Sequence, residues 1–323
     1  MAAGMPRDAV ITGVGLISSL AEGVGEHLRL LNGNQRPAPR LDCDSFAPYP
    51  FHPMVELDLG QQIPKRDQRQ MEPWQRFGTY AAGLALADAG LAGDEAVLSE
   101  AGLIVAAGGG ERDPEVDVAI LEGISSASDP DAFLNERLMS DLRPTLFLAQ
   151  LTNLLAGNIS IVHHVTGSSR SFMGEELAGA MALQTAMRQI GADQGDVFLV
   201  GGSYSAGRPD MLLQLATGGY LLEGSRVPPL WQRGDNGDGL VCGSMGAFVV
   251  LEARAHAEAR GAEIYARLCD VVADRGPRED ANAVAARAAL QAARLKELAG
   301  AGPVGPLSGA SGGGGARGLD APT

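Results

Sequence analysis

The chain has 323 residues, a formal net charge of −14 and a hydrophobic content of 45%, so it is long enough to bury one large core or two ordinary ones. The negative net charge argues against nucleic-acid binding, which needs a basic surface. The sequence contains no run of about 18 apolar residues, so it predicts no membrane span. The N-terminus lacks the apolar segment of a secretory signal, so we expect a cytoplasmic protein.

The cysteines and histidines do not form the spacing patterns of a metal site. Cys43, Cys242 and Cys269 are widely separated and odd in number, which also argues against a disulfide framework. Among five histidines only His163 and His164 are close, and adjacent residues of a strand point to opposite faces. We therefore predict no metal.

The first half of the chain alternates strands and helices. Residues 8–17 read as a buried strand, and a helix is expected at about 22–32. Residues 34–64 are rich in Pro and Asp and predict an extended surface loop. Residues 68–91 have the apolar spacing of a helix, and 101–110 read as a strand that ends in glycines.

The same alternation continues in the second half. The expected elements are a helix broken at Pro144 and a second helix within 133–167, a strand from Ile159, a helix from about Ser171 to Gly191, a strand at 196–202, a strand and helix within 244–262, and a helix at 280–299. This order predicts a layered α/β architecture. The residues after 300 are rich in Gly and Pro, which is typical of a disordered tail.

Two local patterns have more than one interpretation. "GVGLIS" after the first strand begins like a dinucleotide fingerprint, but Ser18 occupies the third glycine position, which favours a tight strand exit. Lys65, Arg66 and Arg69 form a basic patch in an acidic chain, either a docking site or a solvated helix start.

Five segments, in the same order, resemble the β-ketoacyl synthase (condensing enzyme) family. They are "VITGVGLISSLAEGVGEHLRLLNGN", "YAAGLALADAGL", "TNLLAGNISIVHHVTG", "GDVFLVGGSYS" and "RGDNGDGLVCGSMGAFVVLEARAHAEARGAEIYA". The resemblance implies a thiolase-like layered αβαβα fold with an incomplete C-terminal half. The N-terminal half would cover 8–253, the start of the C-terminal half 254–300, and the tail 301–323.

The resemblance also implies a position for the nucleophile. The family has a cysteine in an elbow similar to "TACASGxxAIGxA", and aligning Gly174 and Gly179 with its glycines places Ser171 there. Phe172 and Met173 follow, as acyl-tunnel candidates or as ordinary core residues. A helix N-terminus lowers the pKa of a thiol enough to form thiolate, whereas a serine hydroxyl needs a general base.

Other family positions also differ. Ser311 stands at the position of the first family histidine, the second would lie beyond Thr323, and Ser244 stands where the family commonly has Glu. Glu175 and Glu176 are either a replacement acid and base or residues that complement a helix dipole.

The resemblance implies acyl-chain elongation, with the acyl group carried on the phosphopantetheine of an acyl carrier protein and no other cofactor. The basic patch is the candidate docking site for that protein. We expect a non-catalytic or weakly active partner subunit, similar to a chain-length factor, that forms a homodimer or a heterodimer with a catalytic ketosynthase through a strand at about 159–165. An acyltransferase that uses Ser171 and a truncated family member remain alternatives, and fatty acid and polyketide products are not distinguished.

Overall fold

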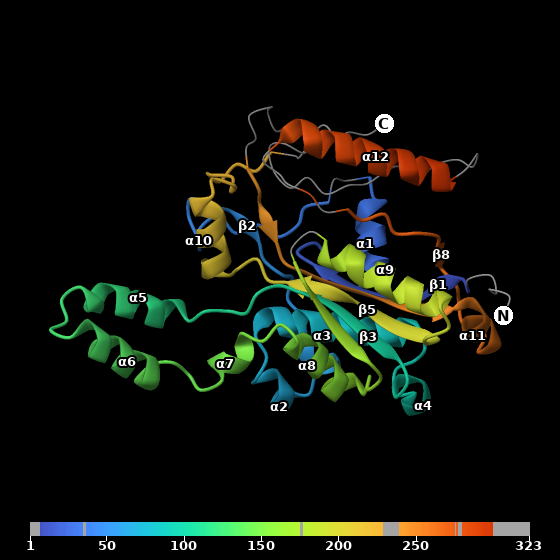
Figure 1. Ribbon diagram of the computed structural model, residues 1–323, viewed down its shortest axis with the longest axis horizontal. Helices are drawn as coiled ribbons and strands as arrows, with labels where there is room; N and C mark the ends of the chain where they lie inside the picture. The colour runs from blue at the N-terminus through green and yellow to red at the C-terminus, as the bar shows by residue number, and fades with distance from the viewer. Residues whose placement is uncertain are drawn as a thin grey trace.

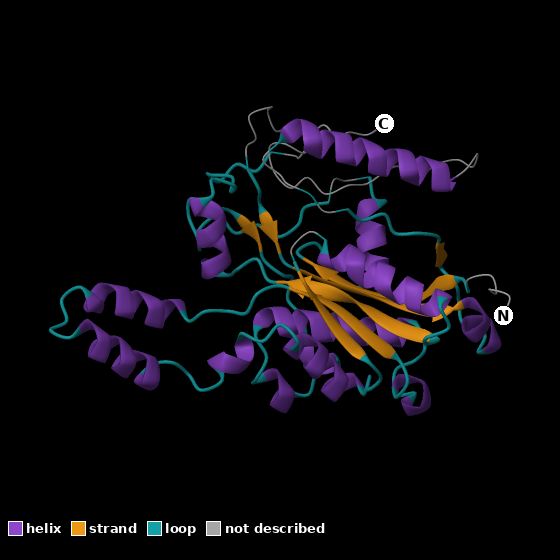
Figure 2. Cartoon of the chain, in the orientation of Figure 1, coloured by secondary structure: helices purple, strands orange, loops and turns teal. Residues whose placement is uncertain are grey.

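One mixed β-sheet organises the chain, with helices on both faces (Figures 1 and 2). The computed structural model describes residues 7–34, 37–174, 177–228, 239–274, 276 and 280–299. The six strands of this sheet lie in the order β4-β3-β5-β7-β1-β8. Their bounds are β1 Ala9–Ser18, β3 Gly102–Ala107, β4 Ser169–Met173, β5 Val197–Tyr204, β7 Met245–Ala253 and β8 Ala266–Leu268.

Strand direction changes within the sheet. Strands β4, β3 and β5 are parallel to one another, whereas β7 runs antiparallel to both β5 and β1. Leu103 lies opposite Ser169 and Leu199, so β3 is hydrogen-bonded on both sides, while β4 is an edge strand. The continuous apolar sequences of β3 and β5 fit this central, buried position.

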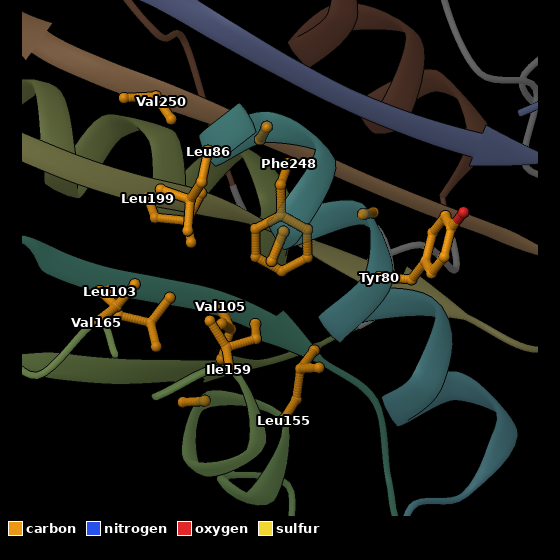
Figure 3. Close-up of a cluster of buried hydrophobic side chains, with 14 of the residues drawn as sticks. Tyr80, Leu86, Leu103, Val105, Leu155, Ile159, Val165, Leu199, Phe248 and Val250 are labelled. Carbon is orange, nitrogen blue, oxygen red and sulfur yellow. The ribbon is translucent and has the colours of Figure 1, made fainter. Parts of the chain in front are cut away.

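Helices α3 (Pro73–Asp88) and α8 (Leu154–His163) cover one face of the sheet. Leu103, Val105 and Leu199 point toward this face, while Tyr80 and Leu86 from α3 pack with them. Figure 3 shows this core and the residues that α8 adds to it. Side chains alternate across a strand, so every second side chain of β3 and β5 points into the core between the sheet and helices α3 and α8.

Helix α9 (Ala178–Gly191) covers the opposite face. Its alanines Ala182 and Ala186 are fully buried against Phe198, Val200 and other residues of the strands. The three layers make one αβα unit of the predicted five-layer arrangement, and the thiolase-like α/β class is confirmed.

A two-stranded pair, β2 (Phe51–His52) and β6 (Cys242–Gly243), lies beside the end of β5. Residues 34–64 were expected to form a surface loop, but they include β2 and the buried side chains of Met54 and Ile63. Apolar residues in this segment pack against the core and therefore fix its path.

Helices α5 (Pro114–Ile124) and α6 (Pro130–Ser140) form a hairpin that projects from the body, at the left of Figure 1. Each begins with an Asp that accepts a hydrogen bond from the third helical N–H, followed by Pro in the first turn.

The remaining helices are α1 Val24–Leu31, η1 Leu59–Gln61, α2 Lys65–Gln68, α4 Glu95–Leu98, α7 Leu146–Ala149, α10 Pro209–Thr217, α11 Arg254–Ala259 and α12 Ala281–Ala299. No described helix is both long and apolar enough to cross a membrane.

Two predicted elements are wrong. Residues 159–165 belong mainly to helix α8 and its end at His164, where φ is +59°, and do not form a strand. Ser171 lies inside strand β4 and not at the start of a helix. The first error arose because β-branched residues favour strands, but Leu155 and Ile159 are four positions apart and bury one helical face.

Candidate functional site

The carboxyl ends of β3, β4 and β5 meet at one edge of the sheet, because the three strands are parallel. Residues 108–111, Gly174 and residues 205–210, which follow these strands, therefore gather there. In α/β proteins this edge is where ligands usually bind. Within 174–177, Glu175 and Glu176 lie outside the described residues.

Ser171 is half-buried and lies opposite Val105 in the β4–β3 ladder. The Leu103 N–H donates to the Ser168 carbonyl at 2.9 Å, and the ladder continues to Met173. Helix α9 begins only at Ala178. The amide groups of Ser171 are those of an extended strand, so no helix dipole acts directly on its hydroxyl.

This register identifies the residues that do precede the helix. Between Met173 and Ala178 the sequence is Gly-Glu-Glu-Leu, which contains neither a thiol nor a hydroxyl group. Gly174 has φ +136°, a conformation that favours glycine, and it ends the strand. The alignment through Gly174 and Gly179 thus puts the nucleophile position inside strand β4, and its assignment to Ser171 stays a prediction.

Phe172 and Met173, the acyl-tunnel candidates, differ in their surroundings. Phe172 is partly buried and packs with the core under α9, whereas the side chain of Met173 is mostly exposed. Adjacent strand residues point to opposite faces, so these two do not line one surface together. A tunnel role for either one stays a prediction.

None of the three cysteines, Cys43, Cys242 and Cys269, lies in the segments that follow β3, β4 and β5, but the Cys242 thiol is hydrogen-bonded to the side chain of Tyr204 at the end of β5. Cys242 lies in β6, and burial raises the pKa of its thiol, so the neutral form is favoured. A thiol in this state is a poor nucleophile.

The histidines are engaged in structural contacts. His163 approaches the Thr79 carbonyl through Nε2 at 2.8 Å, and burial lowers its pKa. His27 lies 2.8 Å from the Ser18 hydroxyl, His52 contacts the Arg40 carbonyl at 2.6 Å, and His256 is paired with Glu252 at 2.7 Å. None of these four contacts involves Ser171. In the described residues no three or more His, Cys, Asp or Glu side chains form a group that could hold a metal ion.

A carboxyl pair that sequence reasoning missed lies beside the loop after β3. Glu111 follows the glycines of this loop, and burial raises its pKa to about 7, with a further contribution from a hydrogen bond to Glu72. Glu72 also caps α3 through mutual hydrogen bonds with Gln75. Its carboxylate forms an ion pair with the Arg143 guanidinium, with 2.6 Å between N and O. The pair thus joins the start of α3, the β3 loop and the segment after α6.

Arg208 holds the same loop from the other side. Its guanidinium donates to the carbonyls of Gly109 and Gly110 at 2.8 and 2.7 Å and pairs with Asp210 at 2.6 Å. Only 7% of its side chain is exposed. Because Arg208 and Asp210 begin α10, these bonds fix the β3 loop against the segment after β5.

Ser244, the predicted departure from the family, is buried and accepts a hydrogen bond from the Ala206 N–H at 2.9 Å. It therefore fixes the backbone after β5. The basic patch is in or next to the short helix α2, and Lys65, Arg66 and Arg69 are all exposed there. Arg66 has an ion pair with Asp67 at 3.2 Å. Ser311 lies outside the described residues.

Comparison with known proteins gives the family. The family model for "Beta-ketoacyl synthase, N-terminal domain" matches residues 7–257. The chain is 29% identical over 285 residues to 3-oxoacyl-acyl-carrier-protein synthase 2 of Rhizobium meliloti (strain 1021), and 26% identical over 269 residues to that of Vibrio harveyi. Each match covers 81% of this chain but only 63% and 61% of those relatives, so the chain spans less than two thirds of their length.

Solved structures have the same fold. A β-ketoacyl synthase from Burkholderia phymatum STM815 superposes with a TM-score of 0.64 at 23% identity and covers 81% of this chain and 63% of its own. The ishigamide ketosynthase/chain length factor gives 0.62 at 24% identity, with 82% and 63% covered. A type II polyketide ketosynthase in complex with its acyl-carrier protein gives 0.60 at 21% identity, with 82% and 68% covered. The family match over residues 7–257 and the shared fold together show that this chain belongs to the β-ketoacyl synthase family.

Proposed function

We propose that this chain is a non-catalytic partner subunit of a ketosynthase that elongates acyl chains. The observation that carries the proposal is the Gly-Glu-Glu-Leu sequence between β4 and α9, where a condensing enzyme of this fold needs a nucleophile at a helix N-terminus. The two glutamates of this sequence offer carboxyl groups, and a carboxylate does not replace a thiolate in attack on a thioester.

The position of Ser171 argues against the alternative of a serine-dependent acyltransferase. A serine needs a general base within hydrogen-bond reach. Its hydroxyl has no hydrogen bond to any described residue, and four of the five histidines are held by other groups. An acyl adduct on Ser171 would support the acyltransferase instead.

The reaction class follows from the family. The curated relatives are named as synthases that act on acyl-carrier-protein substrates, and one structural neighbour is a ketosynthase bound to its acyl-carrier protein. We infer that this chain also works with an acyl carrier protein, which brings the acyl group on phosphopantetheine. The exposed side chains of Lys65, Arg66 and Arg69 are the proposed contacts, because they can pair with an acidic carrier surface.

We place the subunit interface at strand β4. It is the edge strand of the six-stranded sheet, and Ser169 and Arg170 are exposed. A row of unpaired backbone groups favours pairing with a strand of a second chain. The partner is either a second copy of this chain or a ketosynthase that has the cysteine.

The test is intact-protein mass spectrometry after incubation with acyl-carrier-protein thioesters. Wild type, Ser171→Ala and a surface control, Ser126→Ala, are compared on folded protein. We expect no acyl adduct on any of the three. An adduct on wild type and Ser126→Ala that is absent from Ser171→Ala would assign nucleophilic activity to Ser171 and overturn the proposal.

A further inference from the structure

A histidine ring and a serine hydroxyl are in contact where β1 leads into α1. The Nε2 atom of His27 is 2.8 Å from the Oγ atom of Ser18. The rings of His52, His163 and His256 contact carbonyl or carboxylate oxygens instead. A hydroxyl within hydrogen-bond reach of an imidazole is the arrangement that activates a serine as a nucleophile.

The second ring nitrogen of His27 decides which atom donates. Nδ1 is 2.7 Å from the Gly23 carbonyl oxygen, which only accepts, so Nδ1 carries the proton of the neutral ring. Nε2 then has the free lone pair, and the Ser18 hydroxyl donates to it. The Gly23 carbonyl thereby takes the orienting role that a carboxylate has in a catalytic triad. His27 is thus placed to receive the Ser18 proton.

A tight turn between the two residues holds them in this arrangement. The Ser18 N–H donates to the Ala21 carbonyl at 2.9 Å. Helix α1 begins directly after Gly23, and His27, in its first turn, is only 6% exposed. The Leu20 N–H donates to the Ser18 Oγ atom at 3.0 Å. This donor stabilises the negative charge that develops on Oγ when its proton leaves.

Ser18 lies at the same edge of the sheet as the carboxyl ends of β3, β4 and β5. Strands β1 and β5 both run antiparallel to β7, and their last residues, Ser18 and Tyr204, both lie opposite Met245. Ile17 packs in the core under α3, so the side chain of Ser18 points to the opposite face of the sheet. Ser18 is partly exposed there, so a small electrophile can reach Oγ from solvent.

We propose that Ser18 is a nucleophile that accepts the acyl group of small carboxylic esters, with His27 as its general base. The Ser18 Oγ atom bonds to the carbonyl carbon, His27 Nε2 takes the hydroxyl proton, and the alcohol leaves with that proton. Water then attacks the acyl-serine, again through His27, which releases the carboxylic acid and restores the hydroxyl. This esterase activity goes beyond the partner-subunit function, because it requires neither a carrier protein nor a second subunit.

The experiment treats the full chain with a fluorophosphonate probe, which bonds to the oxygen of an activated serine through phosphorus and releases fluoride. Hydrolysis of p-nitrophenyl acetate is measured on the same samples. Ser18→Ala removes the nucleophile, and His27→Gln keeps an amide that can accept from the hydroxyl but cannot take its proton. Ser126→Ala is the matched control, because Ser126 is exposed and bonds to the Gly123 carbonyl. Thermal unfolding shows that each variant is folded, and peptide mass spectrometry locates the label.

We expect wild type and Ser126→Ala to be labelled on Ser18 and to hydrolyse the ester at equal rates. Ser18→Ala should retain only the background of both reactions. His27→Gln should react about 100-fold more slowly, which is the lower end of the usual contribution of a general base.

The proposal is overturned if wild type is not labelled, if the label is on another residue, or if His27→Gln reacts as wild type does. The position of the label in wild type decides the question even where a variant does not fold. A label on Ser171 would also contradict the partner-subunit function, whereas a chain without any label would leave that function in place.

Discussion

The carboxyl groups of Glu72 and Glu111 share a hydrogen bond at the start of α3, and burial is the main reason why the pKa of Glu111 is raised to about 7. Two neighbouring carboxylates repel each other when both are ionised, so a proton on one of them stabilises the contact. Arg208 acts in the opposite direction, since its charge favours ionised Glu111. Burial and the neighbouring carboxyl outweigh Arg208, so the pKa of Glu111 stays above its ordinary value.

The first prediction concerns pH. The pKa of Glu111 in the folded chain lies above its ordinary value of 4.5, so the folded state binds a proton that the unfolded state releases. Stability is then fully present below about pH 4.5 and is lost as the pH rises through about 7. After an allowance for partial solvent screening, we expect a loss of about 2 kcal/mol in the free energy of unfolding.

Urea unfolding from pH 5 to pH 8 measures this loss, with Glu111→Gln as the matched variant. Glutamine keeps the shape but does not titrate, so the difference between variant and wild type should grow in favour of the variant as the pH rises. An unchanged difference across this range would mean that Glu111 is ionised throughout.

The second prediction concerns Arg208. Replacement by Met keeps much of the volume but leaves the Gly109 and Gly110 carbonyls and the Asp210 carboxylate without their partner. We expect a loss of about 3 kcal/mol in unfolding free energy. Arg137→Met is the control, because its pair with Asp141 at 3.1 Å is on the exposed surface and should cost at most about 0.5 kcal/mol. Similar losses for the two variants would show that the bonds from Arg208 to Gly109, Gly110 and Asp210 do not hold the loop in place.

The third prediction concerns the glycines of β1. A Cβ atom at Gly15 would lie 1.9 Å from the Ala81 carbonyl oxygen in α3, a backbone contact that cannot yield locally. Gly15→Ala should therefore cost about 3 kcal/mol or more, measured by denaturant unfolding. Gly25→Ala in α1 is the control, since a Cβ there meets nothing and alanine favours a helix. That variant should be neutral or slightly more stable.

The fourth prediction tests the edge of β4. The backbone groups of alternate residues in a strand point to opposite sides. The Ser168 carbonyl accepts a hydrogen bond from the Leu103 N–H, so the N–H and carbonyl of Arg170 also point toward β3. The N–H and carbonyl of Ser171 therefore point toward the open edge of the sheet. Ser171→Pro should leave the sheet intact but prevent strand addition by a partner. We expect this variant to be folded and monomeric in sedimentation velocity, under conditions that give the proposed dimer for wild type, either with a second copy or with a ketosynthase.

Arg170→Pro is the comparison, because it removes a hydrogen bond inside the sheet and should lower the unfolding temperature. Dimers that survive in Ser171→Pro at the wild-type affinity would show that the interface does not use the β4 edge.

The sequence predicted the strands that form the centre of the sheet. Strands β1, β3 and β5 are continuous apolar segments bounded by glycine or polar residues, and burial leaves such segments little choice of conformation. The edge was harder to predict. The sequence of β4, Ser-Arg-Ser-Phe-Met, has only a weak apolar pattern, and its conformation depends on β3, which lies far earlier in the chain.

The same limit applies to the site. Glu72, Glu111, Arg143 and Arg208 come from four separate elements, and no local pattern predicts that they meet. "GVG" in β1 was interpreted as a strand exit, but Gly13 and Gly15 lie inside the strand, where α3 crosses close to it. The sequence could predict that glycine is needed there, while the partner that requires it became visible only in three dimensions.

The place of β1 in the sheet has a consequence for synthesis. β1 lies between β7 and β8, so Ala9 pairs with Ala253 and with Leu268. The residues of β1 therefore leave the ribosome long before either neighbouring strand is synthesised. This apolar segment stays unpaired while more than half of the protein is translated. Closing such distant contacts is slow, because the loop entropy is lost before the pairing is gained. We expect the emerging chain to depend on chaperones until its last strands leave the ribosome, and the sheet to close in one late step.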